Sequence, residues 1–120
     1  MKLLINLSNH PLAQWGAEQK AAAEQYGEVQ DMPFPQVAPD ASEEDIDELA
    51  AEYVSKIMEL AEDHEVTVHI MGEMTLMFRI VSELKRRGVR CVASTTERIV
   101  TTDEQGNKVS TFRFNQFREY

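Results

Sequence analysis

VTVHIMGEMT, residues 66–75, is the stretch that decides the fold, because a β-branched apolar run breaks at Gly72 and leads directly into a helix. Such a run is typical of an interior parallel strand. The glycine lets the chain turn sharply, and the free N–H groups of the next helix then point outward beside the carboxyl end of the strand. Ligands of open α/β sheets bind at that edge.

Strand-like and helix-like segments alternate on both sides of this stretch. A helix begins at Ser42, whose hydroxyl is suited to cap it, and three acids follow near the positive end of the helix dipole. The expected elements are strand 2–7, helix 14–26, strand 28–32, helix 42–63, strand 66–71, helix 74–87, strand 89–93 and a hairpin of strands 99–102 and 109–114. Right-handed crossovers then predict an α/β fold, a three-layer sandwich with a mostly parallel Rossmann-like sheet and a C-terminal antiparallel hairpin.

Length and composition suit a single domain of residues 1–120, whose 42% hydrophobic content can fill one modest core. No apolar run is long enough to span a membrane and no secretory signal pattern is present, so we expect a cytoplasmic protein that does not interact with a membrane. Cys91 is the only cysteine, which excludes a disulfide within the chain and a cysteine-based zinc site.

The net charge of −9 argues against binding to duplex DNA, which needs a broad basic surface. The charge is uneven: residues 1–65 hold 15 acidic and 3 basic side chains, whereas residues 66–120 hold 6 acidic and 9 basic ones. A small anionic ligand could therefore find a locally positive rim. The alternative is a solvated acidic helix face with ordinary scatter of charge elsewhere.

Four parallel strands bring their carboxyl ends to one edge of the sheet, and polar residues follow each strand. The segments expected there are Ser8–His10, Asp31–Phe34, Met71–Thr75 and Ser94–Arg98. Hydroxyls, an amide, an imidazole and backbone N–H groups suit a ligand with phosphates and bases better than an apolar metabolite.

Several residues at this edge have both a chemical and a structural interpretation. His10 could act as an acid, a base or a phosphate donor, or could cap the following helix. Glu73 could cap its helix, contact a ribose hydroxyl, or act as a base. Arg98 is the nearest cation and could bind phosphate in a bidentate manner, or pair with Glu97. His69 lies inside a strand, so we expect a core or sheet-face histidine.

Several well-known catalytic patterns are missing from the chain. It has no P-loop, no Gly-x-Gly-x-x-Gly, no Gly-x-Ser-x-Gly and no His-Glu-x-x-His motif. Asp31, His10 and Glu73 have no recognisable metal-ligand spacing. We therefore expect no metal site and no resident cofactor.

Four segments carry a resemblance to a known group of proteins: LINLSNHP at residues 4–11, DMPFP at 31–35, VHIMGEMT at 68–75 and CVASTTER at 91–98. Over nearly its whole length the chain resembles small stand-alone members of the CRISPR-associated Rossmann-fold (CARF) superfamily. Such proteins are small dimers that bind cyclic oligoadenylate second messengers of type III CRISPR defence, and several cleave them as ring nucleases.

The resemblance implies a homodimer with one adenylate ring across its two-fold axis, cleaved by a ribose 2′-hydroxyl without a metal. It implies that Ser8, His10 and Glu73 are catalytic. The ligand-binding residues it implies are Asn9, Gly72, Met74, Thr75, Ser94, Thr95, Thr96 and Arg98. The net charge of −9 departs from what a polyanion would favour. Two alternatives remain: a non-catalytic nucleotide-binding module or sponge, and an acidic protein-interaction subunit that uses helix 42–63.

Overall fold

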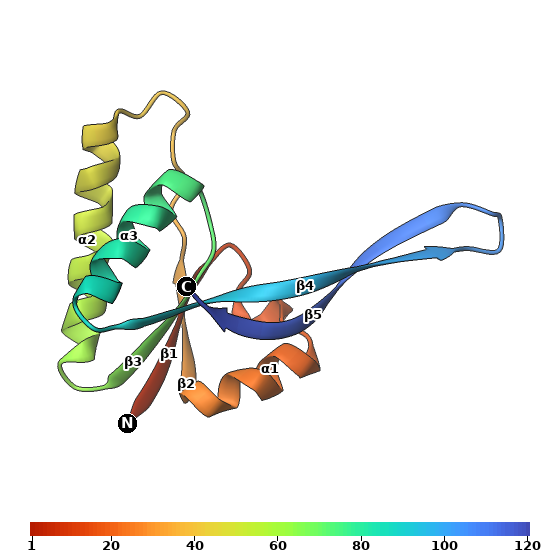
Figure 1. The fold of residues 1–120 in the computed structure, drawn as a ribbon, viewed down its shortest axis with the longest axis horizontal. Helices are drawn as coiled ribbons and strands as arrows, with labels where there is room; N and C mark the ends of the chain where they lie inside the picture. The colour runs from red at the N-terminus through yellow and green to blue at the C-terminus, as the bar shows by residue number, and fades with distance from the viewer.

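A five-stranded sheet runs through the computed structural model, which describes residues 1–120. The strand order is β2-β1-β3-β4-β5, in which the first four strands are parallel and β5 is antiparallel to β4 (Figure 1). The strands are β1 (Lys2–Ser8), β2 (Glu28–Pro33), β3 (Glu65–Ile70), β4 (Arg90–Thr102) and β5 (Lys108–Glu119). The mostly parallel sheet with a C-terminal antiparallel hairpin is thus confirmed.

Helices cover both faces of this sheet, which confirms the three-layer sandwich. One face carries α2 (Glu43–Ala61) and α3 (Met74–Arg86), and the other carries α1 (Ala17–Ala23) (Figure 1). The expected helix 14–26 is shorter than predicted, because two 3-10 turns, Leu12–Gln14 and Glu24–Tyr26, flank α1. None of the helices combines the length and apolar character that a membrane crossing requires.

Alternation along β1 divides the core into two clusters. Leu3, Ile5 and Leu7 point toward α2 and α3 and join the larger cluster, whereas Leu4 joins the smaller cluster beneath α1. The smaller cluster consists of Leu4, Trp15, Ala23, Val92 and Phe117. Asn6 and Ser8 follow Leu4 at two-residue spacing, so polar side chains replace apolar ones on the α1 face as β1 approaches its carboxyl end.

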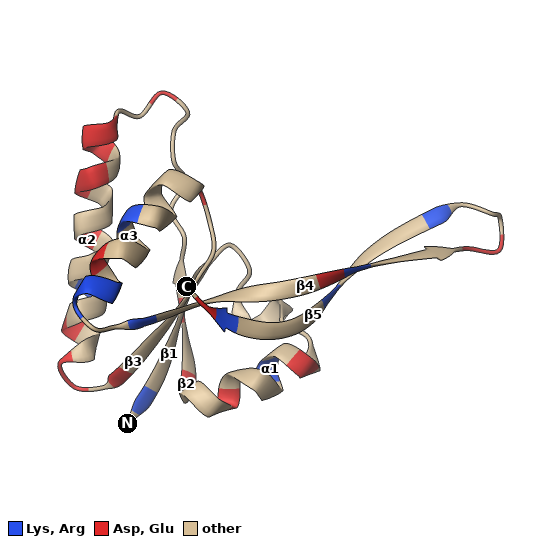
Figure 2. Ribbon diagram, in the orientation of Figure 1, with Lys and Arg blue, Asp and Glu red and all other residues tan.

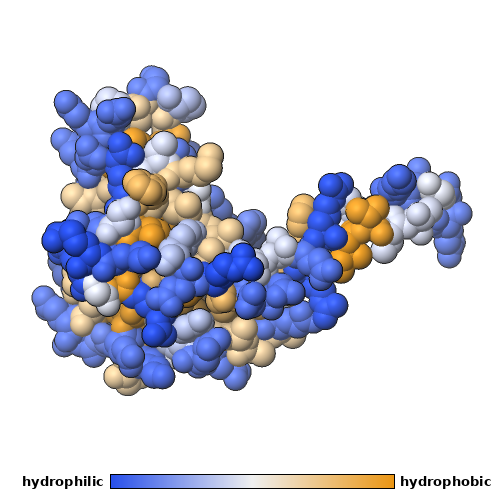
Figure 3. Space-filling model, viewed as in Figure 1, coloured by the Kyte–Doolittle hydropathy of each residue, from blue (hydrophilic) through white to orange (hydrophobic).

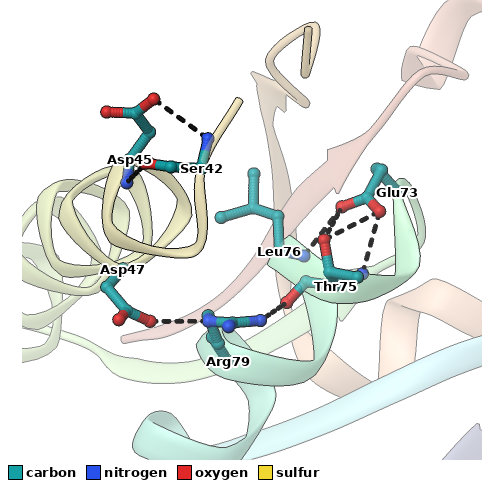
Figure 4. Close-up of polar contacts among 7 residues, drawn as sticks. All are labelled: Ser42, Asp45, Asp47, Glu73, Thr75, Leu76 and Arg79. Carbon is teal, nitrogen blue, oxygen red and sulfur yellow. Dashed lines mark hydrogen bonds and ion pairs between the residues drawn. The ribbon is translucent and has the colours of Figure 1, made fainter. Parts of the chain in front are cut away.

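The start of α2 agrees with the prediction from its sequence. Ser42 accepts a hydrogen bond from the Asp45 backbone N–H at 3.1 Å, and Asp45 accepts one from the Ser42 backbone N–H, which completes a capping box (Figure 4). Ile46, Ala50, Val54 and Ile57 form its buried stripe. Seven of the 15 acidic residues of positions 1–65 lie on α2, more than on any other element (Figure 2).

Strand β4 is longer than predicted, and this corrects the expectation that a strand ends at Ala93. It continues through the segment Ser94–Arg98 to Thr102, with a bulge between Thr95 and Thr96. Beyond Val92, β4 leaves β3 and pairs only with β5, so the two strands form a long arm outside the body (Figure 1). Threonines favour strands, and β5 supplies a hydrogen-bonding partner for β4 from Val92 to Thr102.

The strand order also locates the switch point of the sheet. The connection from β1 to β2 passes over the α1 face, and the connection from β2 to β3 passes over the α2 face. The carboxyl ends of β1 and β3 therefore lie side by side where the chain changes faces. In open α/β sheets such a point is where ligands bind.

Candidate functional site

A polar pocket of about 550 Å³ lies at this switch point, on the α1 face of the sheet. Its walls come from the ends of β1 and β3, from β4, and from the segment that contains α1. The lining residues are Ser8, Asn9, His10, Gln14, Trp15, Gln19, His69, Met71, Gly72, Ser94 and Thr96. Its volume falls within the range of small-molecule sites.

A chain of hydrogen bonds that links four strands runs from behind the pocket to its lining. Ser94 Oγ lies 2.6 Å from His69 Nε2, and His69 Nδ1 lies 2.9 Å from Asn6 Oδ1. Asn6 Nδ2 donates to Asp31 Oδ1 at 2.9 Å and also to the His10 carbonyl at 2.9 Å. The chain of contacts thus runs from Asp31 on β2 to Ser94 on β4.

The geometry of Asn6 assigns the tautomer of His69. The Asn6 amide nitrogen meets two acceptors, Asp31 and the His10 carbonyl, so its oxygen is the atom that faces His69. That oxygen accepts from the Ser8 hydroxyl at 2.7 Å and, because a carbonyl oxygen can only accept, His69 Nδ1 must carry the proton. His69 Nε2 is then an acceptor, and the Ser94 hydroxyl donates to it.

Burial keeps the His69 imidazole neutral at physiological pH. The side chain is 2% exposed, and the rings of Trp15 and Phe117 each lie 5.4 Å from it in edge-on geometry. Desolvation, the larger cause, and the nearby charge of His10 together lower its pKa from 6.5 to about 4. A neutral imidazole with an unprotonated nitrogen is in the protonation state that a general base needs, and here that nitrogen accepts from the Ser94 hydroxyl.

Six of the residues predicted for the site line this pocket together. They are Ser8, Asn9, His10, Gly72, Ser94 and Thr96. Ser8 is buried and its hydroxyl is engaged by Asn6 and by the backbone N–H of His10, whereas the His10 side chain is exposed at the pocket edge. Ser8 therefore holds the loop in place, and His10 is free to meet a ligand.

Glu73 and Thr75 lie outside the pocket, against a separate hollow beside Ala38 and Pro39. The Glu73 carboxylate caps α3: it accepts from the backbone N–H groups of Thr75 at 3.1 Å and Leu76 at 2.8 Å, and from the Thr75 hydroxyl (Figure 4). These bonds lower its pKa, the largest cause being the Thr75 hydroxyl. The N–H groups expected to bind a phosphate are thus occupied by a carboxylate.

Three further predicted residues are not brought into the pocket. The Met74 side chain is 76% exposed at the start of α3. The Thr95 hydroxyl donates to the Gln116 carbonyl across the β4–β5 ladder at 3.1 Å. Arg98 lies on the arm, where its guanidinium donates to the Ser110 hydroxyl at 3.0 Å. The reason is the same for Thr95 and Arg98, because β4 continues past the sheet edge instead of ending there.

Gly72 is required for a reason other than its turn. A Cβ at this position would lie 2.6 Å from ring atoms of Phe34, which is buried in the larger core cluster. The backbone angle φ of Gly72 is not in the left-handed region, unlike those of Gly27, Gly88 and Gly106. The close approach of Phe34, rather than a special turn, explains the glycine.

Four lining residues, Gln14, Trp15, Gln19 and His69, and the supporting residue Asn6 were not predicted for the site. Met71 in the lining and Asp31 behind it were expected at this edge of the sheet, but without a role in the site. A sequence signal existed for part of this set. Alternation places Leu4, Asn6 and Ser8 on one face of β1, and the parallel register sets Asn6 beside His69. Polar residues at every second position of a buried strand mark a face that leaves the apolar core.

The charge of the pocket is low. No lysine or arginine lines it, and basic side chains cluster instead near the end of α3 and on the arm (Figure 2). A second hollow of about 550 Å³ lies between α2 and α3, but Arg79 pairs there with Asp47 and Arg87 pairs with Glu83. Both arginines of this hollow are therefore paired, and its remaining charged lining residues, Glu59 and Glu62, are acidic, so it is unsuited to an anionic ligand.

Comparison with protein families matches residues 2–118 to the family described as “Uncharacterized protein MJ1673 family”, so the chain belongs to that family. No curated protein matches the chain.

Proposed function

We propose that this member of the MJ1673 family binds a cyclic oligoadenylate of type III CRISPR defence and cleaves it by metal-independent attack of a ribose 2′-hydroxyl. The observation that carries the proposal is the polar pocket at the switch point between β1 and β3. The resemblance of residues 4–11, 68–75 and 91–98 to CARF proteins supports the same ligand class. The protein would then act in the cytoplasm.

The lining chemistry supports a ligand made of bases and phosphodiesters. Asn9, Gln14 and Gln19 offer both donors and acceptors, which is what the edge of an adenine requires. The Thr96 hydroxyl and exposed His10 offer donors to a phosphate. One pocket of about 550 Å³ suits part of a ring, so the remaining nucleotides would occupy the same pocket of a second copy across a two-fold axis.

For cleavage by a ribose hydroxyl, the protein needs only to align the hydroxyl with the phosphate, transfer protons and stabilise charge on the phosphoryl oxygens. In this scheme His10, which lines the pocket, exchanges a proton with the leaving oxygen. Ser8 is a positioning residue in this scheme, since its hydroxyl is bonded within the protein. Glu73 has no part in it, because its carboxylate caps α3.

The absence of lysine and arginine from the pocket lining favours a second candidate, a non-catalytic sponge that binds the same ring. A pentacoordinate phosphorane carries more negative charge than the bound ring, and a cation would normally stabilise it. The acidic face of α2 supports a third candidate, a subunit that captures a basic protein partner (Figure 2).

The three candidates are separated by one set of measurements. The purified protein is incubated with cyclic tri-, tetra- and hexa-adenylate. Binding is measured by calorimetry, and products are detected by chromatography. Binding with cleavage that His10→Ala abolishes supports the leading proposal, with His64→Ala at the end of α2 as the matched control. Tight binding without products, unchanged by His10→Ala, supports the sponge. Failure to bind any ring overturns both.

The acidic-subunit candidate has its own test. Reversal of charge at Glu48, Glu52 and Glu59 should abolish capture of a basic partner and leave ring binding unchanged. Capture that survives the reversal would remove this candidate.

A further inference from the structure

We propose that Ser94 and His69 form the proton acceptor of the pocket: Ser94 Oγ takes the proton of the attacking 2′-hydroxyl and passes its own proton to His69 Nε2. Asn6 is the positioning residue that holds the imidazole in the required tautomer. This inference rests on the proposed function, and it adds a base that the sequence did not indicate.

The hydrogen-bond count at Ser94 leaves one position open to a ligand. Its proton is directed at His69 Nε2, 2.6 Å away, and one of its lone pairs accepts from Gln19 Nε2 at 3.2 Å. The second lone pair has no partner within the protein, and Ser94 lines the pocket. A ligand hydroxyl that donates to this lone pair completes a continuous path for the proton.

Burial explains why the path needs the serine. His69 is 2% exposed and is enclosed by Trp15 and Phe117, so its imidazole has little direct access to a ligand. Ser94 is less buried and bridges the imidazole to the pocket. The charged or titratable groups near His69 are His10 at the pocket edge and Asp31 behind Asn6.

The ligand strengthens this base when it binds. In the free protein the imidazole has a pKa of about 4, so Nε2 is unprotonated and available at neutral pH. A phosphodiester anion placed in the pocket favours the imidazolium and raises the pKa toward its ordinary value. The serine–imidazole pair therefore becomes more basic in the complex in which the proton is transferred.

The step balances without any other reactant. The 2′-O–H bond breaks, its proton passes to Ser94 Oγ, and the Ser94 proton passes to His69 Nε2. The 2′-oxygen forms a bond to the adjacent phosphorus, and the bond from phosphorus to the 5′-oxygen breaks. The 5′-oxygen takes a proton from His10 or water, and His69 returns its proton through Ser94 to solvent. The products are a 2′,3′-cyclic phosphate and a 5′-hydroxyl.

The tautomer can be tested on the wild-type protein without any ligand. Nitrogen-15 NMR of the imidazoles should show His69 neutral at pH 6, with its proton on Nδ1. A proton on Nε2 would overturn the inference, because the Ser94 hydroxyl could then not donate to that nitrogen. This measurement is independent of whether the protein binds a ring.

The activity test uses the variants Ser94→Ala and His69→Gln. Thr95→Ala is the matched control, because the Thr95 hydroxyl bonds to β5 and lies outside the pocket. With cyclic tri-, tetra- and hexa-adenylate, both variants should bind within about threefold of wild type and cleave about 100-fold or more slowly. The Thr95→Ala protein should match wild type. The wild-type rate should also fall at acid pH as the base protonates, and the residual rate of His69→Gln should lack this fall.

Three results would overturn the inference. One is cleavage by Ser94→Ala at the wild-type rate. This variant tests the inference by itself if His69→Gln fails to fold. Another is a phosphorylated Ser94 in mass spectra, because Ser94 would then be a nucleophile. The third is wild-type binding without cleavage, which leaves the binding function intact, whereas failure of wild type to bind any ring removes the proposed function itself.

Discussion

Asn6 on β1 and His69 on β3 are direct partners in the parallel ladder, and Asn6 Oδ1 lies 2.9 Å from His69 Nδ1. Asn6 is 1% exposed, and its one amide also serves Ser8, Asp31 and the His10 carbonyl. A single side chain therefore satisfies the buried polar groups of two strands and of the loop that forms one wall of the pocket.

Replacement of Asn6 by leucine should destabilise the protein by about 3 kcal/mol, because the His69 Nδ1–H would be buried without a partner, and Asp31 and the His10 carbonyl would lose the Asn6 amide. Chemical denaturation of the variant measures this loss. Asn107→Leu is the control, since Asn107 is exposed in the turn of the arm and should change stability little. Equal effects of the two substitutions would show that the buried network does not stabilise the fold.

Stability should depend on pH because of His69. Its pKa is about 4 in the folded protein and 6.5 when unfolded, so between these values the unfolded state binds the extra proton. Stability should therefore be flat above about pH 7.5, fall by about 2 kcal/mol as the pH is lowered to 5, and lose about 3 kcal/mol in all by pH 4. Urea denaturation from pH 5 to 8 measures the slope, and His69→Gln should flatten it. A wild-type curve that is level over this range would contradict the burial of a neutral imidazole.

Gly72→Ala should destabilise the fold by about 1–3 kcal/mol, because its methyl group would meet the Phe34 ring at 2.6 Å within a packed core. Gly16→Ala is the control, since a Cβ there has no atom within 4 Å. Thermal denaturation compares the two. If Phe34→Leu relieves the effect of Gly72→Ala in the double variant, the contact itself is responsible, whereas additive effects would indicate a different cause.

Features that depend on local sequence could be predicted. The capping box of Ser42 and Asp45 and the stripe of α2 involve residues within a few positions of one another, and the order of strands and helices follows from their periodicity. The pairing of β4 with β5 could not be read in this way, because Val92 and Glu119 are far apart in the chain. Without that pairing, the hydroxyl-rich segment after Ala93 resembles the end of a strand.

The same limit applies to the site. The edge of the sheet and six of its lining residues follow from where strands end. The partnership of Asn6, His69 and Ser94 depends on the register of three strands, which short-range patterns do not specify. The expectation that His69 is a core or sheet-face histidine is confirmed by its burial, but its link to Ser94 could not be predicted, and Arg98 was assigned to a pocket that it does not line.

Glu73→Gln should lower the melting temperature by roughly 2–5 °C, because the charged cap at the N-terminus of α3 is weakened. Ring binding and cleavage should be unchanged, since Glu73 lies outside the pocket. Glu52→Gln on the exposed face of α2 is the control. A large loss of cleavage at constant melting temperature would instead restore Glu73 to the chemistry.

The arm of β4 and β5 should be the least stable part of the sheet. Its base is held to α1 by Arg113, which pairs with Glu18 at 2.8 Å. Farther out the two strands pair only with each other, and Val100, Val109 and Phe112 are exposed, Phe112 by 70%. Hydrophobic atoms are visible on the surface of the arm (Figure 3). Two strands alone are marginally stable in water.

Hydrogen exchange should therefore be about 100-fold or more faster at residues 99–111 than in β1 and β3, because the arm can open without unfolding the body. Exchange measured by mass spectrometry at two protein concentrations tests this. Slow exchange in the arm that becomes fast on dilution would contradict the prediction, and would mean that a second copy of the chain covers the exposed valines and Phe112 at the higher concentration.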